Sequence, residues 1–326
     1  MVRPPASLRT PRALDVAGAT IAVTGASGFV GEHLVRHLKL RFPQARILRA
    51  DRAPDAALRF DLNDPATATA IVGEEPDVVV HLAGESSISG AGREAGETWR
   101  VNLLGTLALA RALADHGRPY TFLFASSAEV YGRAFASELP VTEASAPQPM
   151  SVYGRCKFAL EAMLTDVVGP HATLVVVRPS NHVGPGQAAR FALPSFARQI
   201  AEGERRGGTT TIKVGSLNAE RDFLDVRDVV SAYGELIARL HNSGRRAIFN
   251  VSSGVARSVR SMLDMLVAEA RISCQIEVDQ ALVRPSEIPK ALVSPRLIEQ
   301  FTCWKPQYPL EQTVADILDD ARQRQR

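Results

Sequence analysis

Tyr153 and Lys157 stand four positions apart in a segment with helical periodicity, so their side chains share one face of the expected helix. A free phenol has a pKa of about 10, and a neighbouring ammonium group favours the phenolate and lowers that pKa. Ser126 and Ser127 end an expected strand upstream, where a serine hydroxyl can polarise a carbonyl oxygen. A tyrosine that donates a proton, a lysine that adjusts its pKa and a serine that orients the carbonyl together predict hydride-transfer chemistry on a carbonyl group.

A glycine-rich turn directly follows the short apolar strand expected at 21–23. Its glycines are spaced three residues apart, at Gly25, Gly28 and Gly31. Glycines let the backbone approach a pyrophosphate, whose charge the N-terminus of the next helix stabilises. Asp51 ends the second expected strand, where a carboxylate accepts hydrogen bonds from adenosine ribose hydroxyls and repels a 2′-phosphate. The adjacent Arg52 would attract that phosphate, so the turn predicts a dinucleotide site that favours NAD and leaves NADP open.

Other residues near this turn are candidates for contact with the dinucleotide. They are Ser27, Phe29, Val30, Leu82 and Ala83. Asp61 and Leu62 are candidates to flank the adenine, with a surface aspartate beside a core leucine as the alternative. Asn102, inside an expected helix, either positions backbone or water near Lys157 or only packs within its helix.

The elements that must position these residues alternate between strands and helices. Strands are expected at 21–23, 46–50, 77–82, 121–125 and 174–177, and helices at 30–40, 97–115 and 152–167. Strands that alternate with helices at this spacing indicate a parallel sheet covered on both faces. The expected fold class is α/β, a Rossmann doubly wound parallel sheet with a smaller C-terminal α/β substrate-binding lobe.

The later part of the chain supplies that lobe. Helices are expected at 196–202, 226–240, 259–270 and 310–321, and one more sheet strand at 247–251. The expected organisation is a disordered leader at 1–18, an NAD(P)-binding domain at 19–180 to which 222–251 returns, and a lobe from 181–221 and 252–326. Open α/β sheets bind ligands at the carboxyl ends of their strands, so the lobe should cover that edge.

Composition narrows the class of protein. The 326 residues are 45% hydrophobic and 22% charged, with a net charge of +3 and no run of Lys and Arg, which argues against nucleic acid or an anionic membrane as partner. No apolar stretch approaches the roughly 18 residues of a membrane span, and the first residues lack a secretory h-region. The three cysteines lack metal-ligand spacing, which predicts reduced thiols in a cytoplasmic protein and no metal site.

The complete pattern resembles the extended short-chain dehydrogenase/reductase family over nearly the whole chain. Downstream segments are similar to the branch that handles GDP-linked 4-keto-6-deoxy-hexoses. They are R-P-S-N-H-V-G-P-G-Q at 178–187 and the segments 191–202, 212–215, 221–228 and 284–289. Similarity to the GDP-4-keto-6-deoxy-D-mannose reductases of this branch implies reduction of the 4-keto group of a nucleotide-linked sugar with NAD(P)H. For that branch the product is GDP-D-rhamnose.

The resemblance also implies roles for single residues. Ser127, Tyr153 and Lys157 would be catalytic; Asn181, Arg221 and Arg284 would hold the nucleotide diphosphate; Glu287 would hold the nucleoside ribose; and Ser86 and Ser87 would also contact substrate. Guanidinium groups pair bidentately with phosphate oxygens, although ion pairs with Asp222, Asp225 or Glu287 are the alternative for the arginines. His182 either reaches the sugar or is a structural loop residue. The family further implies a homodimer through the helices at 97–115 and 152–167.

Departures from the family pattern leave rival functions open. Ser180 replaces the usual phenylalanine at a place expected beside the nicotinamide and the sugar, which leaves the hexose undetermined. Glu129 occupies the position at which related 4,6-dehydratases carry the base for C5, so dehydration ranks second and 4-epimerisation third. Ala128, where some dehydratases carry an acidic partner, argues against dehydration. A catalytically silent nucleotide sensor is disfavoured because the chain keeps both Tyr153 and Lys157.

Overall fold

The computed structural model describes residues 16–53, 56–85, 95–137, 139–241, 246–283 and 288–325. Its main sheet has seven strands in the order β10-β6-β5-β4-β1-β2-β3, and all of their pairings are parallel. The strands are β1 (Thr20–Thr24), β2 (Arg46–Asp51), β3 (Leu58–Arg59), β4 (Val78–His81), β5 (Thr121–Ala125), β6 (Thr173–Pro179) and β10 (Arg246–Val251). The strand order reverses direction between β1 and β4, as in a doubly wound fold. This confirms the predicted α/β class with a parallel sheet.

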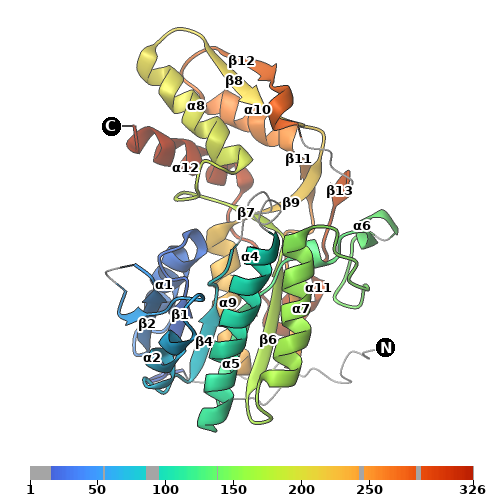
Figure 1. Ribbon diagram of the computed structural model, residues 1–326. Helices are drawn as coiled ribbons and strands as arrows, with labels where there is room; N and C mark the ends of the chain where they lie inside the picture. The colour runs from blue at the N-terminus through green and yellow to red at the C-terminus, as the bar shows by residue number, and fades with distance from the viewer. Residues whose placement is uncertain are drawn as a thin grey trace.

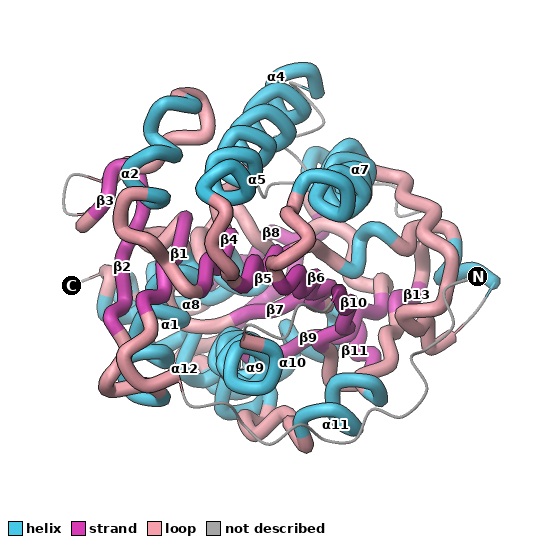
Figure 2. The backbone as a smooth tube through the Cα atoms, turned by 90° about the horizontal axis from the view of Figure 1, so that it is seen from below, coloured by secondary structure: helices cyan, strands magenta, loops and turns pink. Residues whose placement is uncertain are grey.

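Helices cover both faces of this sheet, which is why β4 and β6 are mostly apolar and are buried along their whole length. Figure 2 shows the sheet edge-on between the two helical layers. One layer contains α1 (Phe29–Arg41), α9 (Val226–Leu240) and α11 (Arg296–Thr302), and the other contains α2 (Ala68–Val72), α5 (Gly105–His116) and α7 (Val152–Val167). Each layer closes its own hydrophobic core against the sheet.

The long helix expected at 97–115 is interrupted near its start. It runs as α4 (Ala95–Trp99), a π-helical turn at Arg100–Leu104, and then α5, which ends at Gly117 in the left-handed conformation with φ 76°. A π-helical turn shifts the residues of one helical turn relative to the regular helix, and such turns often occur at functional sites. Here the turn carries Asn102, which is buried.

A smaller lobe lies beyond the carboxyl ends of the main sheet, above it in Figure 1. Its β9 (Glu220–Asp225) pairs with β7 (Asn181–Val183), β11 (Ala256–Ser258) and β13 (Lys290–Ala291), while β8 (Thr210–Val214) pairs with β12 (Cys274–Val278). Its helices are α8 (Ala192–Arg206), α10 (Val259–Glu269) and α12 (Leu310–Gln323), which share one apolar core. The lobe joins the sheet through β6, which leads directly into β7, and through β9, which leads into α9.

Shorter helical segments complete the described chain. They are α6 (Ala134–Ser137) and the 3₁₀ turns at Pro65–Thr67, Ala128–Val130 and Gln280–Leu282. The structured part begins before residue 19, contrary to the expected leader at 1–18. Val16 is 4% exposed within the core that also contains α1 and α9, because its apolar side chain packs there. Residues 1–15 lie outside the described residues.

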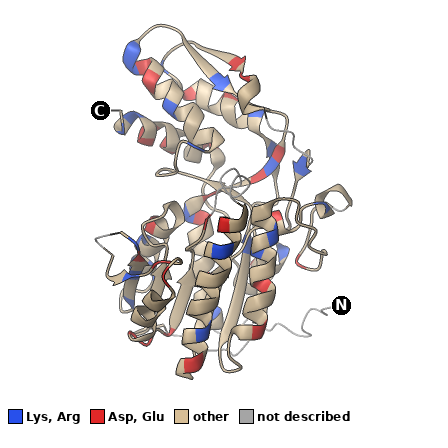
Figure 3. Cartoon of the chain, in the orientation of Figure 1, with Lys and Arg blue, Asp and Glu red and all other residues tan. Residues whose placement is uncertain are grey.

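Charged side chains of both signs are interspersed over both lobes (Figure 3). In the described ranges, no helix has the length and apolar character needed to cross a membrane. Within the same residues, no group of three or more His, Cys, Asp or Glu side chains is arranged to hold a metal ion. All three cysteines are free.

Candidate active site

The glycine-rich turn forms a backbone cradle at the end of β1. Gly25 has φ 68°, and a Cβ there would lie 2.9 Å from the Ala83 nitrogen. A Cβ on Gly31 would lie 2.2 Å from the Gly25 carbonyl oxygen, closer than any real contact. The turn leads into the thirteen-residue helix α1, whose N-terminus favours negative charge. The residues present therefore fit the diphosphate of a dinucleotide.

Asp51 stands beside this cradle as an ionised carboxylate. Its Oδ2 accepts a hydrogen bond from the Ser27 N–H at 2.9 Å, and its Oδ1 accepts one from the Arg52 N–H at 2.7 Å. Burial acts to raise the pKa of Asp51, but the hydrogen bonds from Ser27 and Arg52 outweigh it and hold that pKa below its usual value. The side chain of Arg52 is exposed next to it. Both groups that bear on the choice between NAD and NADP thus lie at the expected place.

The remaining dinucleotide candidates surround the turn. Phe29 opens α1 and stacks on His182, with ring centroids 6.2 Å apart and planes 9° apart. Val30 is partly buried against the core of the α1 layer. Leu82 and Ala83 follow β4, and the Ala83 N–H donates to the Thr24 hydroxyl at 3.2 Å. These contacts join the turn to β4 and to the lobe.

Asp61 and Leu62 lie farther along, between β3 and α2. Asp61 Oδ1 accepts the N–H of Asn63 at 2.9 Å, so its carboxylate stabilises a local turn. Leu62 packs so tightly over α5 that a Cβ on Gly105 would come within 2.6 Å of it. Both residues are half-buried. Their contacts describe the local structure, and a role beside adenine stays a prediction.

Asn102 holds backbone next to Lys157. Its Oδ1 accepts the Glu85 N–H at 2.8 Å, and its Nδ2 donates to the Glu85 carbonyl at 3.5 Å. A Cβ on Gly84 would lie 3.0 Å from Asn102 Oδ1 and 4.0 Å from Lys157 Nζ. The π-helical turn therefore places this amide against the segment that follows β4, on the same side as the lysine.

Lys157 is a buried ammonium aimed at the end of β5. It is 6% exposed, and its Nζ donates to the Ala125 carbonyl at 2.7 Å. The same nitrogen lies 4.8 Å from the centroid of the Phe124 ring and 5.8 Å from that of Tyr153, within range of cation–π attraction. Desolvation lowers the pKa of Lys157 to about 8, although Cys156 and Glu161 act in the opposite direction.

Tyr153 and Ser127 meet through a hydrogen bond between their side chains. The expectation that Lys157 lowers the pKa of the phenol is wrong for the protein without ligands. Desolvation of the half-buried Tyr153, followed by the negative charge of Glu129, raises that pKa, and the bond to Ser127 offsets this only in part. The phenol therefore stays protonated at neutral pH, which is the form that a proton donor needs.

Glu129 and Arg221 bring opposite charges to the same place. Burial raises the pKa of Glu129 and lowers that of Arg221, and the attraction between the two side chains opposes both shifts. The guanidinium of Arg221 also donates from Nη1 to the Glu220 carbonyl at 2.8 Å. Glu129 comes from the 3₁₀ turn after Ser127, and Arg221 comes from β9 of the lobe. The lobe thus supplies a cation close to Glu129.

The carboxylates that offered alternative ion pairs for Arg221 bind elsewhere. Asp222 accepts hydrogen bonds from the Ser253 N–H at 2.9 Å, the Gly254 N–H at 2.9 Å and the Ser180 hydroxyl at 3.2 Å. Asp225 instead pairs with Arg227 at 2.6 Å. Both carboxylates stabilise the base of the lobe.

Ser180 is 5% exposed, and its hydroxyl points to Asp222. Asp222 thus provides a buried acceptor for this side chain, and the expected position of Ser180 beside the nicotinamide and sugar stays a prediction. Asn181, which begins β7, is exposed. His182 is a structural link: its Nδ1 lies 3.0 Å from the Ser180 carbonyl and its ring stacks on Phe29. Burial lowers the pKa of His182, so it is neutral.

Four other predicted substrate-binding residues lie outside the described residues. They are Ser86, Ser87, Arg284 and Glu287.

The structure also reveals a buried polar cluster behind the site that the sequence reasoning missed. Its centre is Glu161, one helical turn after Lys157 on α7, and this spacing was the one available signal.

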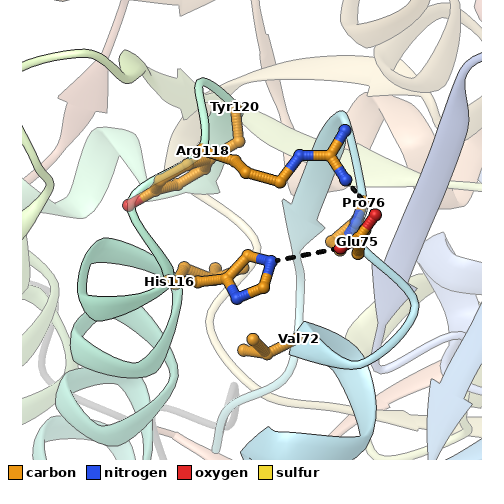
Figure 4. Close-up of a pocket in the computed structure, with 7 residues that line it drawn as sticks. Val72, Glu75, Pro76, His116, Arg118 and Tyr120 are labelled. Atoms are coloured by element: carbon orange, nitrogen blue, oxygen red, sulfur yellow. Dashed lines mark hydrogen bonds and ion pairs between the residues drawn. The ribbon is translucent and has the colours of Figure 1, made fainter.

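A small pocket lies at the opposite, amino-terminal edge of the main sheet. It is lined by Val72, Glu75, Pro76, Leu113, His116, Arg118 and Tyr120 (Figure 4). Glu75 pairs with Arg118, and its Oε1 lies 3.6 Å from His116 Nε2. The space is about 10 Å³, roughly what one water molecule needs. This pocket is too small for a sugar or a nucleotide.

Residues 21–252 match the model of the NAD dependent epimerase/dehydratase family. The match begins at β1 and includes the glycine cradle, Asp51, Ser127, Tyr153 and Lys157. The chain belongs to this family.

Relatives with individual functions match nearly the whole chain. GDP-6-deoxy-D-mannose reductase from Pseudomonas aeruginosa is 36% identical over 305 residues, which are 93% of this chain and 97% of that protein. The dTDP-6-deoxy-L-talose 4-dehydrogenase (NAD(P)(+)) from Kitasatospora kifunensis is 30% identical over 80% of this chain and 82% of that protein. The solved structure of RMD from Pseudomonas aeruginosa complexed with NADPH superposes with a TM-score of 0.82 at 34% identity, and covers 94% of this chain and 98% of the other.

Proposed function

We propose that this protein reduces the 4-keto group of a nucleotide-linked 4-keto-6-deoxy-hexose, with GDP-4-keto-6-deoxy-D-mannose as substrate and GDP-D-rhamnose as product. The observation that carries the proposal is a protonated Tyr153 phenol, hydrogen-bonded to Ser127, on the helix that buries the Lys157 ammonium. The choice of sugar is supported by the 36% identity to a GDP-6-deoxy-D-mannose reductase across nearly all of both chains.

The residues of the chain divide the chemistry among them. When bound, NAD(P)H supplies the hydride that reduces the sugar ketone. Ser127 and Tyr153 donate hydrogen bonds to the ketone oxygen, which polarises the carbonyl. Tyr153 then gives its proton to the nascent alkoxide, and the ammonium of Lys157 stabilises the phenolate that remains. The Ala125 carbonyl, which accepts from Lys157 Nζ at 2.7 Å, fixes the position of that charge.

The dinucleotide is held by the cradle and its neighbours in this proposal. Gly25, Gly28 and Gly31 admit the diphosphate, and Asp51 accepts from the adenosine ribose. The relative whose structure contains NADPH supports use of the phosphorylated coenzyme, with the exposed Arg52 as the residue that would meet the 2′-phosphate. NAD and NADP therefore both fit this site, and their relative affinity reports the balance between Asp51 and Arg52.

The sugar nucleotide is held from the lobe. Arg221 is the described residue that we favour for the diphosphate, because its guanidinium interacts with Glu129, whose charge also acts on Tyr153. Asn181 is exposed at the start of β7 and completes the described part of the proposed set. Arg284, Glu287, Ser86 and Ser87 remain proposed contacts. Arg284→Ala should raise the KM for the sugar nucleotide far more than the Kd for coenzyme, and the reverse pattern would reassign this arginine.

One observation favours a second function, nucleotide-sugar 4,6-dehydration. Glu129 lies near Tyr153, and its charge affects the pKa of the phenol. A carboxylate there could remove a proton from C5 of the sugar. However, Ala128 occupies the position at which some dehydratases carry an acidic partner, which argues against this alternative.

A panel of nucleotide sugars separates the functions. Purified protein is mixed with NADH or NADPH and with GDP-, dTDP- and UDP-linked 4-keto-6-deoxy sugars, and the loss of coenzyme absorbance is followed. Oxidation of one coenzyme per ketone reduced supports the reductase, and NMR of the product identifies its configuration at C4. Formation of a keto sugar from GDP-mannose without net coenzyme change would establish dehydration instead, and interconversion of C4 epimers would establish the epimerase.

We also propose that the protein is a cytoplasmic homodimer. Within each subunit, the domain built on the main sheet binds the dinucleotide and the smaller lobe binds the sugar nucleotide. The free cysteines support a reducing compartment. Leu104 and Phe158 support a dimer through α5 and α7, since these large apolar side chains are 50% and 38% exposed on neighbouring helical segments. Light scattering of the wild type and of Leu104→Glu tests this, because the variant should be monomeric.

A further inference from the structure

Glu161 and Arg178 form a buried ion pair directly behind the proposed active site. Glu161 lies on α7 four residues after Lys157, and Arg178 lies near the end of β6. The pair is bidentate, with Arg178 Nε 3.0 Å and Nη2 2.6 Å from the two carboxylate oxygens. The side chains of Glu161 and Arg178 are 5% and 3% exposed, respectively. Burial of two charges costs desolvation free energy. The attraction between the charges offsets that cost only if the hydrogen-bond geometry is excellent, as it is in this pair.

The pair reaches the segment that carries Ser127. The hydroxyl of Ser126 donates to Glu161 Oε1, and the Ser126 N–H donates to the Val177 carbonyl at 2.8 Å. One helical turn earlier, Lys157 Nζ donates to the Ala125 carbonyl at 2.7 Å. Helix α7 therefore holds the two residues before Ser127 with two side chains one turn apart. This double attachment fixes α7 against the end of β5.

The other side of Arg178 reaches the segment after Ser127. Arg178 Nη1 donates to the Tyr131 hydroxyl at 3.1 Å, and that hydroxyl donates to Asn250 Oδ1 at 2.7 Å. The guanidinium carbon also lies 5.0 Å from the centroid of the Tyr131 ring. Asn250 belongs to β10, and its N–H donates to Glu143 at 2.8 Å. The chain from 126 to 131 is thus anchored at both ends to one buried pair.

We propose that Glu161 and Arg178 are positioning residues, which hold Ser127 and Lys157 in the arrangement needed for carbonyl chemistry. The inference rests on the proposed function. Its rival is a pair that only stabilises the fold. A displacement of about 1 Å in a reacting group can cost roughly a hundredfold in rate, so a device that fixes α7 against β5 has a measurable consequence.

Glu161 also acts on the charge of Lys157. The titratable groups that face this ammonium are Tyr153, Cys156 and Glu161 on α7 and His81 on β4. Burial lowers the pKa of His81 to about 3, so it is neutral, and its ring nitrogens bond to Thr24 and Thr106. Glu161 raises the pKa of Lys157 against the desolvation that lowers it. Loss of this carboxylate should therefore make Lys157 release its proton at lower pH.

The test uses the cofactor-free full chain first. Trace acetic anhydride competitively labels the amines of wild type and Glu161→Gln across a pH series, and peptide mass spectrometry follows Lys157. We expect the labelling midpoint of Lys157 to move to lower pH in Glu161→Gln. Glu204→Gln is the matched control, because it breaks a similar pair with Arg322, at 2.7 Å from each carboxylate oxygen, in the lobe. It should lower the melting temperature and leave the Lys157 midpoint unchanged.

Steady-state kinetics and a milder variant complete the test. Ser126→Ala keeps both charges but removes the bond to Glu161, and we expect its kcat to fall about tenfold with little change in KM, while Ser126→Thr recovers most of it. Folded Glu161→Gln or Ser126→Ala with wild-type kcat would overturn the inference. Should Glu161→Gln fail to fold, Ser126→Ala decides alone. Should the wild type reduce no keto sugar, the proposed function fails, whereas the Lys157 midpoint still tests the link between Glu161 and Lys157.

Discussion

The two ends of the parallel sheet contain similar residues in different surroundings. At the carboxyl ends, the charge of Glu129 acts on both Tyr153 and Arg221, and burial shifts the pKa of all three groups. At the amino ends, Glu75 pairs with Arg118 and lies near His116 (Figure 4), and these side chains are 36–54% exposed. Water screens the second group. Burial, and not residue type, therefore distinguishes the reactive end.

Tyrosine gives the sharpest form of this comparison. Tyr153→Phe should fold and bind coenzyme but lose about a hundredfold or more in kcat, as expected for a removed general acid. Tyr120→Phe is the matched control, because Tyr120 is also buried and desolvation raises its pKa to about 12, but it lies at the amino end. Its kcat should stay within about twofold of wild type. Steady-state kinetics with melting curves checks both, and equal losses would break the comparison.

The pH dependence follows from Lys157. The ammonium is needed to stabilise the phenolate, and its pKa in the protein without ligands is lowered to about 8, so kcat/KM should be full below that pH and fall about tenfold per pH unit above it. The free energy of unfolding should instead increase as the pH rises. An unfolded lysine keeps its proton to about pH 10.4, so the folded state releases a proton first and gains stability as pH rises through that window.

A pH–rate profile checks the predicted fall in activity at high pH. Denaturant unfolding of the wild type and of Lys157→Met checks the predicted gain in stability. The variant should lack the gain in stability between about pH 8 and 10. A profile that stays flat to pH 10 would show that the charge of Lys157 is irrelevant to turnover.

Substitution of an arginine at either end of the sheet should affect the KM for the sugar nucleotide differently. Arg221→Ala removes the proposed diphosphate contact and should raise the KM for the sugar nucleotide about tenfold or more, since hydrogen-bonded charge pairs are worth about 1.5–3 kcal/mol. Arg118→Ala, which removes an exposed partner of Glu75, should change KM and stability little. Substrate saturation curves at fixed coenzyme check this, and an unchanged KM in Arg221→Ala would move the diphosphate elsewhere.

Asp51 should show the smallest of these effects. Its carboxylate is ionised and repels a 2′-phosphate, so Asp51→Asn should shift the ratio of affinities toward NADPH by several-fold. Arg52→Ala should shift the ratio toward NADH. Titration of protein fluorescence with each coenzyme measures both ratios, and a shift in the opposite direction for either variant would contradict the assignment.

Much of the fold could be predicted from sequence where periodicity extends over many residues. Helices α7 and α9 have the expected bounds, 152–167 and 226–240, because long amphipathic segments define their own ends. The lobe strands β7, β8, β9, β11, β12 and β13 were missed, since they form by pairing between segments that the sequence pattern does not relate to one another. Local pattern contains no signal for such tertiary pairing.

The site was predictable in composition but not in electrostatics. Motifs placed Ser127, Tyr153 and Lys157 on one helix and one strand end, and the structure brings them together. The direction of the pKa shift on Tyr153 was wrong, because spacing does not reveal desolvation or the approach of Glu129. The pair of Glu161 with Arg178 joins different elements, so only the position of a glutamate one turn after Lys157 indicated it.

A crystal structure with coenzyme and the product sugar nucleotide tests the central claim most directly. The account predicts that the Tyr153 hydroxyl lies within hydrogen-bonding reach, about 2.6–3.2 Å, of the sugar O4, with Ser127 on the same oxygen. A sugar bound with O4 beyond reach of Tyr153, while another acid contacts it, would contradict the account.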